Sequence, residues 1–188
     1  TIHWKILVFD AIIRSKLLYG LETIQLKHNE LNRLDGFQAR GYRRILKIPP
    51  THIDRSTSNE DIYRIITFII EKPVKRFSEY YQAAKYKLLG HIIRSDNEDP
   101  IRQVTFEPYS IRPKDTLKWR QGRRRLIWAE ETLAEAWEDL HTAIGLPYWE
   151  PYDPESENDR YTLLSKASWL GGVITPLSNP LLRGSNPG

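Results

Sequence analysis

The order of apolar and polar positions along the chain predicts a mainly helical protein. Most of the apolar segments show the spacing of helices, and turn-forming residues separate them. We expect helices over residues 2–21, 29–48, from Ser56 or Ser58 towards 70, 74–94 and 126–144. Residues 101–107 fit either a strand or a further short helix. The expected fold class is mainly α, an irregular multi-helix domain of about five helices with an extended, non-regular C-terminal tail.

The segment 29–48 has the clearest pattern. Asn29 is a suitable N-cap residue, and the Pro49–Pro50 pair prevents the helix from continuing. At about 100° per residue, one half of this helix is apolar and predicts a packed face, with Leu31, Leu34, Phe37, Tyr42, Ile45 and Leu46. The opposite side carries five basic residues within an arc of about 100°, namely Arg33, Arg40, Arg43, Arg44 and Lys47.

The first and last expected helices differ from this amphipathic pattern. Residues 2–21 are apolar almost all round, which is typical of a buried helix. In 126–144 an apolar stripe is formed by Leu126, Leu133, Trp137, Leu140 and Ile144, while Trp128 lies off the stripe. Four acidic residues, Glu131, Glu135, Glu138 and Asp139, are expected to face away from it.

Composition suggests a boundary near residue 146. Residues 1–146 hold all the expected long helices, whereas 147–188 are first acidic and then rich in Pro, Gly, Ser and Asn. We therefore expect a helical region over 1–146 and a C-terminal extension over 147–188. Thr1 is not a translation start, so we expect the chain to be a fragment or a processed product.

The absence of cysteine excludes disulfides, zinc knuckles and thiol nucleophiles within this sequence. No run of 18 or more apolar residues is present, so no membrane span is expected. Net charge is only +4, but it is unevenly distributed. Residues 1–125 carry 25 Lys and Arg against 14 Asp and Glu, whereas residues 126–188 carry 3 against 10. The basic part predicts a surface that faces a polyanion.

A catalytic centre is not indicated. The histidines His3, His28, His52, His91 and His141 are scattered and form no metal-binding pair. Asp96, Glu98 and Asp99 could hold a hard cation, but a solvated loop that ends a helix explains them better. We expect no enzymatic activity from this chain by itself and no cofactor.

Two basic clusters are the positive signal for binding. The first is the helix face with Arg40, Arg43, Arg44 and Lys47. The second is a connector with Lys114, Lys118, Trp119, Arg120, Arg123, Arg124 and Arg125, followed by Trp128. Basic side chains neutralise phosphates, and tryptophan can stack on a base. A solvated charged surface explains the first cluster equally well. The second favours a bound anion, because three consecutive arginines repel one another.

Four stretches, in one order along the chain, resemble the region after the palm in non-LTR (LINE-like) retrotransposon reverse transcriptases. They cover about residues 3–140 and read Ser15-Lys16-Leu17-Leu18-Tyr19-Gly20-Leu21-Glu22, Phe37-Gln38-Ala39-Arg40-Gly41-Tyr42-Arg43-Arg44-Ile45-Leu46, Lys87-Leu88-Leu89-Gly90-His91-Ile92-Ile93-Arg94 with Asp99-Pro100-Ile101-Arg102, and Gly122-Arg123-Arg124-Arg125 with Trp128. The last stretch departs from the family pattern, since Arg124 stands where a proline is usual.

The resemblance implies a thumb-like region that grips a template–primer duplex by its backbone. The family's catalytic Tyr-x-Asp-Asp turn is missing, because the sequence contains no adjacent aspartates. The resulting hypothesis is a non-catalytic fragment that binds RNA or an RNA–DNA hybrid through backbone contacts.

The alternative hypothesis is a structural subunit of a large protein assembly, derived from such a fragment. Its C-terminal extension is foreign to the family pattern and would then dock on other protein chains. The residues expected to dock are Trp149, Tyr152, Trp169, Leu177, Leu181 and Leu182.

Overall fold

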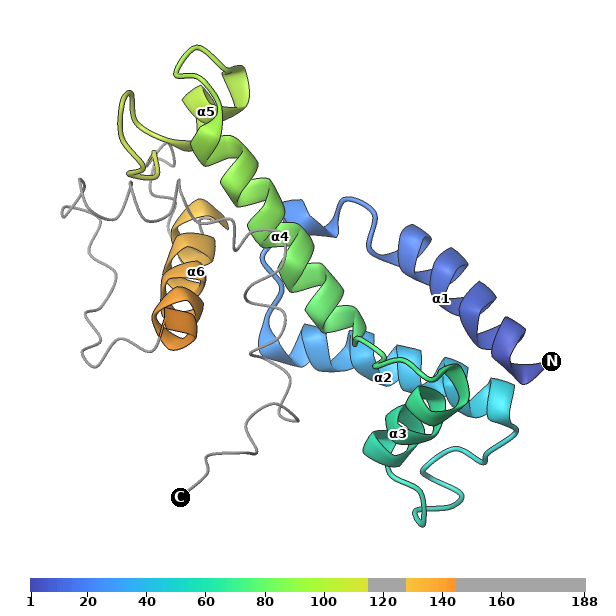
Figure 1. Ribbon diagram of the computed structural model, residues 1–188. Coiled ribbons are helices and arrows are strands. Elements are labelled where there is room, and N and C mark those ends of the chain that lie inside the picture. Colours follow the sequence, from blue (N-terminus) through green and yellow to red (C-terminus); the bar gives the residue numbers. More distant parts are fainter. Residues whose placement is uncertain (115–127, 145–188) are drawn as a thin grey trace, which may run out of the picture. The chain divides into compact units, whose positions relative to one another are not determined.

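The computed structural model describes residues 1–114 and 128–144, with side chains placed up to Asp139 in the last helix (Figure 1). These residues form six α-helices, one short 3-10 helix and no sheet, so the predicted mainly helical fold is confirmed. The elements are α1 (Ile2–Leu17), η1 (Leu21–Thr23), α2 (His28–Leu46), α3 (Asn59–Ile70), α4 (Phe77–Arg94), α5 (Pro100–Thr105) and α6 (Trp128–Ile144). The segment 101–107, expected as a strand or a short helix, begins as a helix, since α5 ends at Thr105 and Phe106 is extended.

The chain divides into two compact units, Thr1–Gln82 (unit 1) and Ala83–Gly188 (unit 2). Unit 1 contains the helices α1 to α3 and the first residues of α4. The described part of unit 2 contains the rest of α4, together with α5 and α6. The predicted extension over 147–188 lies outside the described residues.

Unit 1 is built from helices that pack on their neighbours in sequence. Helix α1 contacts both α2 and α3, and α2 contacts α3. The buried cluster between them combines aliphatic and aromatic side chains: Ile6, Ala39, Tyr42, Ile62, Tyr63 and Ile66. Ile6 is the buried residue of α1. The prediction that the first helix is buried is therefore wrong, because only one face of α1 packs on unit 1 while other apolar residues stay exposed.

The helix starts follow their side-chain caps. The predicted start of α3 is confirmed, since the Ser58 hydroxyl accepts the backbone N–H of Asp61 at 3.2 Å. The predicted cap of α2 is wrong: its N-cap is Lys27, and Asn29 already lies inside the helix. The Glu30 carboxylate accepts the backbone N–H of Lys27 at 2.7 Å, and this bond satisfies a donor ahead of the first turn.

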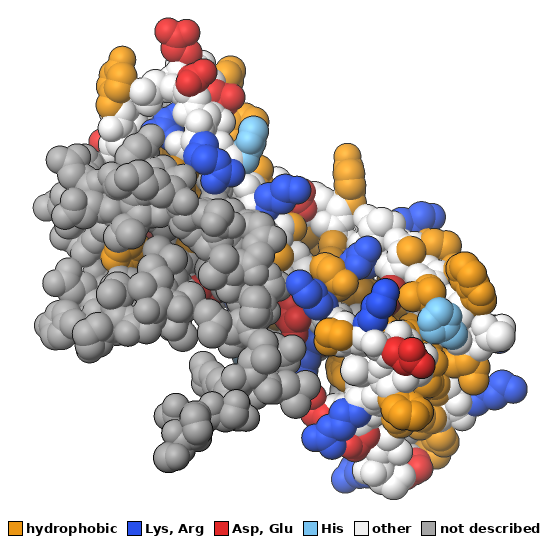
Figure 2. Space-filling model, in the orientation of Figure 1, with side chains coloured by type: hydrophobic (Ala, Val, Ile, Leu, Met, Phe, Trp, Pro, Cys, Tyr) orange, Lys and Arg blue, Asp and Glu red, His pale blue; other side chains and the backbone are white. Residues whose placement is uncertain are grey.

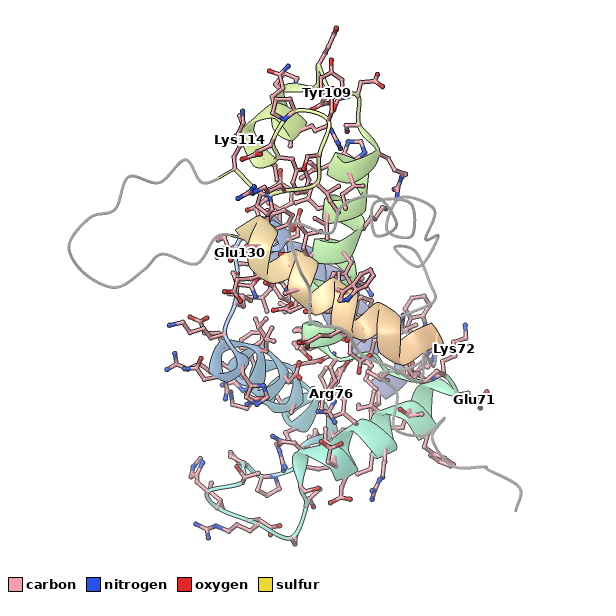
Figure 3. All side chains as sticks on the ribbon, turned by 90° about the vertical axis from the view of Figure 1, so that its left-hand side faces the viewer. Glu71, Lys72, Arg76, Tyr109, Lys114 and Glu130 are labelled. Carbon is pink, nitrogen blue, oxygen red and sulfur yellow. The ribbon has the colours of Figure 1, made fainter. Side chains whose placement is uncertain are left out.

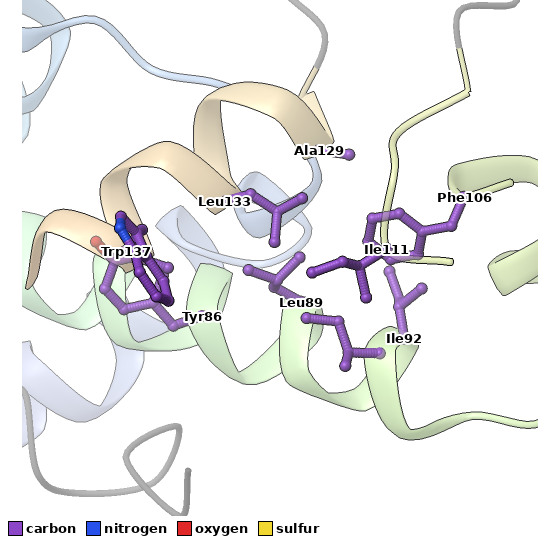
Figure 4. Packing of buried hydrophobic residues seen from close by; sticks show 10 residues of the cluster. Tyr86, Leu89, Ile92, Phe106, Ile111, Ala129, Leu133 and Trp137 are labelled. Carbon is purple, nitrogen blue, oxygen red and sulfur yellow. The ribbon is translucent and has the colours of Figure 1, made fainter. Parts of the chain in front are cut away.

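Unit 2 packs α4 against α6 and the segment after α5 (Figure 4). Leu133 and Trp137 are buried as the predicted stripe requires, whereas Leu126 and the side chains of Leu140 and Ile144 lie outside the described part. The buried cluster contains Tyr86, Leu89, Ile92, Ile93, Phe106, Ile111, Ala129, Leu133, Ala136 and Trp137.

Two acidic residues of α6 do not face away from the protein as predicted. Glu135 forms an ion pair with Lys85, whose side chain is almost fully buried. The Tyr86 hydroxyl donates to the Asp139 carboxylate at 2.5 Å. Both carboxylates therefore meet polar groups of α4 at the edge of the apolar cluster, because a buried ammonium or hydroxyl requires a partner.

Candidate nucleic-acid interface

The exposed side of α2 presents a row of basic side chains. Arg33, Arg40, Arg44 and Lys47 are all exposed, and they lie within an arc of about 80° at the helical repeat. Phe37, predicted on the packed half of the helix, is instead exposed, with 40% of its surface accessible, and lies beside these cations. Positions 33, 37, 40 and 44 follow one line along α2, and Lys47 extends the row as the C-cap of the helix; the row spans about 21 Å at 1.5 Å per residue. We call these five residues the α2 ridge.

Acidic side chains of α2 do not neutralise the ridge. Glu30 accepts the backbone N–H of Lys27, and Asp35 accepts both the backbone N–H and the hydroxyl of Ser78, at 2.9 and 2.7 Å. The ion pairs found among the described residues involve none of the four ridge cations. On the face seen in Figure 2, basic, acidic and hydrophobic side chains lie exposed among one another over unit 1.

Arg43 is not part of this exposed row, contrary to the prediction from the helical repeat. Only 3% of its surface is accessible. Its guanidinium donates to the carbonyls of Pro49 and Thr57, at 3.1 and 2.6 Å, and to the Asn59 side chain at 3.3 Å. The loop between α2 and α3 folds over this side of the helix, so Arg43 holds the loop and is removed from the candidate interface.

A polar network on the opposite face of α2 fixes the helix within unit 1. The Gln38 amide donates to the Tyr42 hydroxyl and the Lys75 carbonyl, at 2.9 and 3.1 Å. Its oxygen accepts the Tyr63 hydroxyl and the Phe77 N–H, at 3.0 and 2.9 Å. Sequence analysis missed Gln38, although the signal was present: a polar residue stands four positions from both Leu34 and Tyr42, on the predicted apolar half.

The network continues to α1 and perturbs its ionisable groups. The Tyr42 hydroxyl donates to Asp10 at 2.7 Å. Burial raises the pKa of Asp10 above its usual value, although the hydrogen bond from Tyr42 opposes the shift. Burial, together with the hydrogen bond to Asp10, also raises the pKa of the Tyr42 hydroxyl. Arg76 (Figure 3) lies over the Tyr63 ring with its guanidinium carbon 5.2 Å from the ring centre, and pairs with Glu60.

The raised pKa of Asp10 predicts that the stability of the protein depends on pH. Because the pKa is raised in the folded state, the stabilising contribution of protonated Asp10 is complete at low pH and is lost as the pH rises through the raised pKa. Asp10→Asn keeps an acceptor for Tyr42 but cannot ionise. We expect the free energy of unfolding of Asp10→Asn, relative to wild type, to increase between about pH 4 and 7, as measured by urea denaturation.

Asp96→Asn, on the exposed loop after α4, controls for the loss of one carboxylate. A relative stability of Asp10→Asn that decreases over the same pH range would contradict the direction of the shift.

The second basic cluster lies largely outside the described residues. This applies to Lys118, Trp119, Arg120, Arg123, Arg124 and Arg125, and also to the predicted docking residues Trp149, Tyr152, Trp169, Leu177, Leu181 and Leu182. Two residues near its ends are described. The Lys114 ammonium (Figure 3) donates to the Gln103 carbonyl at 2.6 Å, and Trp128 is half-buried against the apolar cluster of unit 2.

The Asp99-Pro100-Ile101-Arg102 stretch at the start of α5 has a structural explanation. Arg102 is buried, and its guanidinium donates to the carbonyls of Ile93 and Ser110, at 2.6 and 3.2 Å. It thereby satisfies a carbonyl in the last turn of α4 and fixes the turn that follows α5. Asp99 caps α5 by accepting the N–H of Ile101 at 2.8 Å. His91 is exposed on α4.

Within the described residues, no group of three His, Asp or Glu side chains is placed to hold a metal ion. None of the helices there is long and apolar enough to cross a membrane. No protein-family model matches the chain, and neither a curated protein nor a solved structure matches it. The resemblance to reverse transcriptases therefore depends on the sequence motifs alone.

Proposed function

We propose that the chain is a non-catalytic nucleic-acid-binding fragment that contacts a phosphate backbone through the α2 ridge. The observation that carries this proposal is the alignment of four exposed cations and one exposed phenylalanine along about 21 Å of α2 and its C-cap residue. Within the described residues none of these cations forms an ion pair. Binding through such a row depends on charge and is largely independent of base sequence.

The dimensions of the ridge suit a polynucleotide. One strand of a duplex advances about 3.4 Å per phosphate, so the ridge matches about six nucleotide steps. Each phosphate that a lysine or arginine neutralises releases counterions, which strengthens binding at low salt. The exposed Phe37 ring additionally offers a surface for stacking on an unpaired base.

The polar network behind the ridge supports the same role. Buried hydrogen bonds of Gln38 and Tyr42 hold α2 against α1 and α3, so the cations are presented on a rigid element rather than on a loop. Resemblance to the thumb of non-LTR retrotransposon reverse transcriptases adds the expected ligand class, an RNA–DNA hybrid or RNA.

The test is a titration of a fluorescent RNA–DNA hybrid at salt concentrations between about 50 and 200 mM. Arg33→Gln/Arg40→Gln/Arg44→Gln/Lys47→Gln is expected to bind far more weakly at low salt. Its slope of log affinity against log salt should be smaller than that of wild type by about 3 to 4, since each lost phosphate contact contributes about 0.9.

The matched control is Lys72→Gln/Lys75→Gln/Lys87→Gln/Arg94→Gln, which removes four exposed cations from other elements. It should retain most of the affinity. Equal losses of affinity in the two variants would show that binding depends only on net charge, and would contradict a contact at the ridge. If the wild-type chain does not bind the hybrid at low salt, the proposed function is rejected. Arg123→Ala/Arg124→Ala/Arg125→Ala tests the second cluster in the same assay.

The alternative, a structural subunit of a larger assembly, stays a prediction from the sequence. It was based on an extension whose expected docking residues lie outside the described part of the chain.

A further inference from the structure

Helix α1 carries an apolar stripe on its exposed side, in addition to the face that packs on unit 1. Trp4, Leu7, Val8 and Ile12 have between 39% and 65% of their surfaces accessible, with Trp4 the most exposed. Together with the exposed Ala11 they lie within an arc of about 140° on the helix. We call these five residues the α1 stripe. A contiguous exposed apolar patch on a protein surface marks an interaction site.

The spacing of the stripe indicates the shape of its partner. Positions 4, 7, 8, 11 and 12 follow the i, i+3, i+4, i+7, i+8 pattern by which one helix packs on another. Ala11 lies between the larger side chains of the stripe. A small residue there leaves a notch into which a ridge of a facing helix can fit. A flat lipid surface gains nothing from such a notch.

The charges beside the stripe indicate the partner's chemistry. Lys5 and Lys16 are exposed along one edge, and His3 is exposed along the other. Arg14 on that second edge is half-buried, with its guanidinium carbon 4.4 Å from the centre of the Tyr80 ring. The acidic residue of α1, Asp10, is half-buried and accepts the Tyr42 hydroxyl. The exposed rim of the stripe is therefore basic on α1, and it complements a helix whose apolar face is bordered by Asp or Glu.

A second copy of the chain does not fit this rim. In an antiparallel pair of α1 helices, the edge with Lys5 and Lys16 meets the same edge of the other copy. In a parallel pair, that edge meets the one with Arg14. Both arrangements bring like charges together across the seam, which is destabilising.

We infer that the α1 stripe is a docking surface for an amphipathic helix of another protein, with acidic residues on both sides of its apolar face. The contact buries the Trp4 indole as an anchor at the N-terminal end of the stripe, since large aromatic residues carry most of the energy of such interfaces. The lysines set the orientation and the choice of partner. This surface is separate in residues from the α2 ridge.

The probe is a synthetic helical peptide of about three heptads, with leucine and alanine along one face and glutamate on both sides of it. A twin peptide carries lysine in place of every glutamate. Fluorescence anisotropy with the full chain should show micromolar binding of the glutamate peptide and much weaker binding of the lysine twin. Lys5→Glu/Lys16→Glu is expected to reverse this preference.

Leu7→Gln/Ile12→Gln should weaken binding of the glutamate peptide by about tenfold or more. Phe68→Gln/Val104→Gln removes two exposed apolar residues elsewhere and should leave it unchanged. Circular dichroism establishes that the variants remain folded.

Three outcomes would overturn the inference. The first is no binding of the glutamate peptide, or equal binding of both peptides. Another is concentration-dependent self-association that Leu7→Gln/Ile12→Gln abolishes, which would make the stripe an interface between copies. The third is binding to vesicles of phosphatidylserine and phosphatidylcholine that the same variant abolishes, in the absence of peptide binding.

Discussion

Replacing Gly41 with alanine is expected to lower the free energy of unfolding by about 2 to 3 kcal/mol. A Cβ atom at position 41 would lie 2.1 Å from Cζ of the Phe9 ring and 2.5 Å from Cε2, far inside van der Waals contact. Phe9 cannot turn aside freely, because its ring packs on Tyr42 and Phe77, with centroid distances of 5.5 and 6.5 Å. Helices α1 and α2 would have to move apart.

Gly36 provides a matched control in the same helix. A Cβ atom there meets only the far end of Arg40, at 3.7 Å, so Gly36→Ala should stabilise the protein by up to about 1 kcal/mol through helix propensity. The two substitutions are chemically identical, but their effects on the free energy of unfolding are expected to have opposite signs. Thermal or urea denaturation measures both effects.

The double variant Phe9→Leu/Gly41→Ala tests the cause. If the Phe9 ring is the obstacle, removing its tip should recover part of the loss, and the two substitutions will be non-additive. Strict additivity, or a Gly41→Ala variant as stable as wild type, would show that α1 and α2 do not approach each other as closely as described.

Replacing Gln38 with methionine is expected to cost about 3 kcal/mol or more, as buried polar groups lose their partners. Methionine fills a similar volume, so the effect reports hydrogen bonds rather than a cavity. The Lys75 carbonyl and the Phe77 N–H both lose a bond to the side chain, and the Tyr63 hydroxyl loses an acceptor.

Gln103→Met is the control for Gln38→Met, since Gln103 is exposed on α5, and its stability should change by less than about 0.5 kcal/mol. Chemical denaturation of both variants gives the comparison. A loss for Gln38→Met as small as that of the control would mean that the four bonds of Gln38 contribute little to unit 1.

Local signals predicted the helices well, and tertiary contacts account for the differences. Ser58 begins α3 as expected because capping is a local interaction. Asn29 was the wrong cap because Glu30, one residue further on, binds the backbone of Lys27. The prediction that the first helix is buried was wrong because composition shows only how apolar a helix is. Which of its faces is covered depends on how the other helices pack.

The charged face of the candidate site was predictable from the sequence, but the burial of Arg43 within it was not. Arg40, Arg44 and Lys47 are exposed in agreement with the helical repeat. Arg43 lies at the edge of the same arc, where the loop over 49–59 supplies two carbonyls for its guanidinium. The pattern of residues in α2 does not predict the path of that loop. Gln38 illustrates the converse, because its polar partners come from segments distant in sequence.

The packing of neighbouring helices in unit 1 bears on how the protein folds as it is made. Helices α1 and α2, and likewise α2 and α3, are neighbours in sequence, whereas the contacts between α1 and α3 close a longer stretch of chain. The entropic cost of closing a loop grows only slowly with its length, and helical topologies of this kind form faster than chains are synthesised, at about 5–20 residues per second. The last partners to arrive are Phe77 and Ser78, which complete the bonds of Gln38 and Asp35, and then Tyr81, whose hydroxyl bonds the backbone of Ile24 and Leu26. Unit 1 can therefore close while later residues are still being added, and the α1 stripe is available to its partner from that moment.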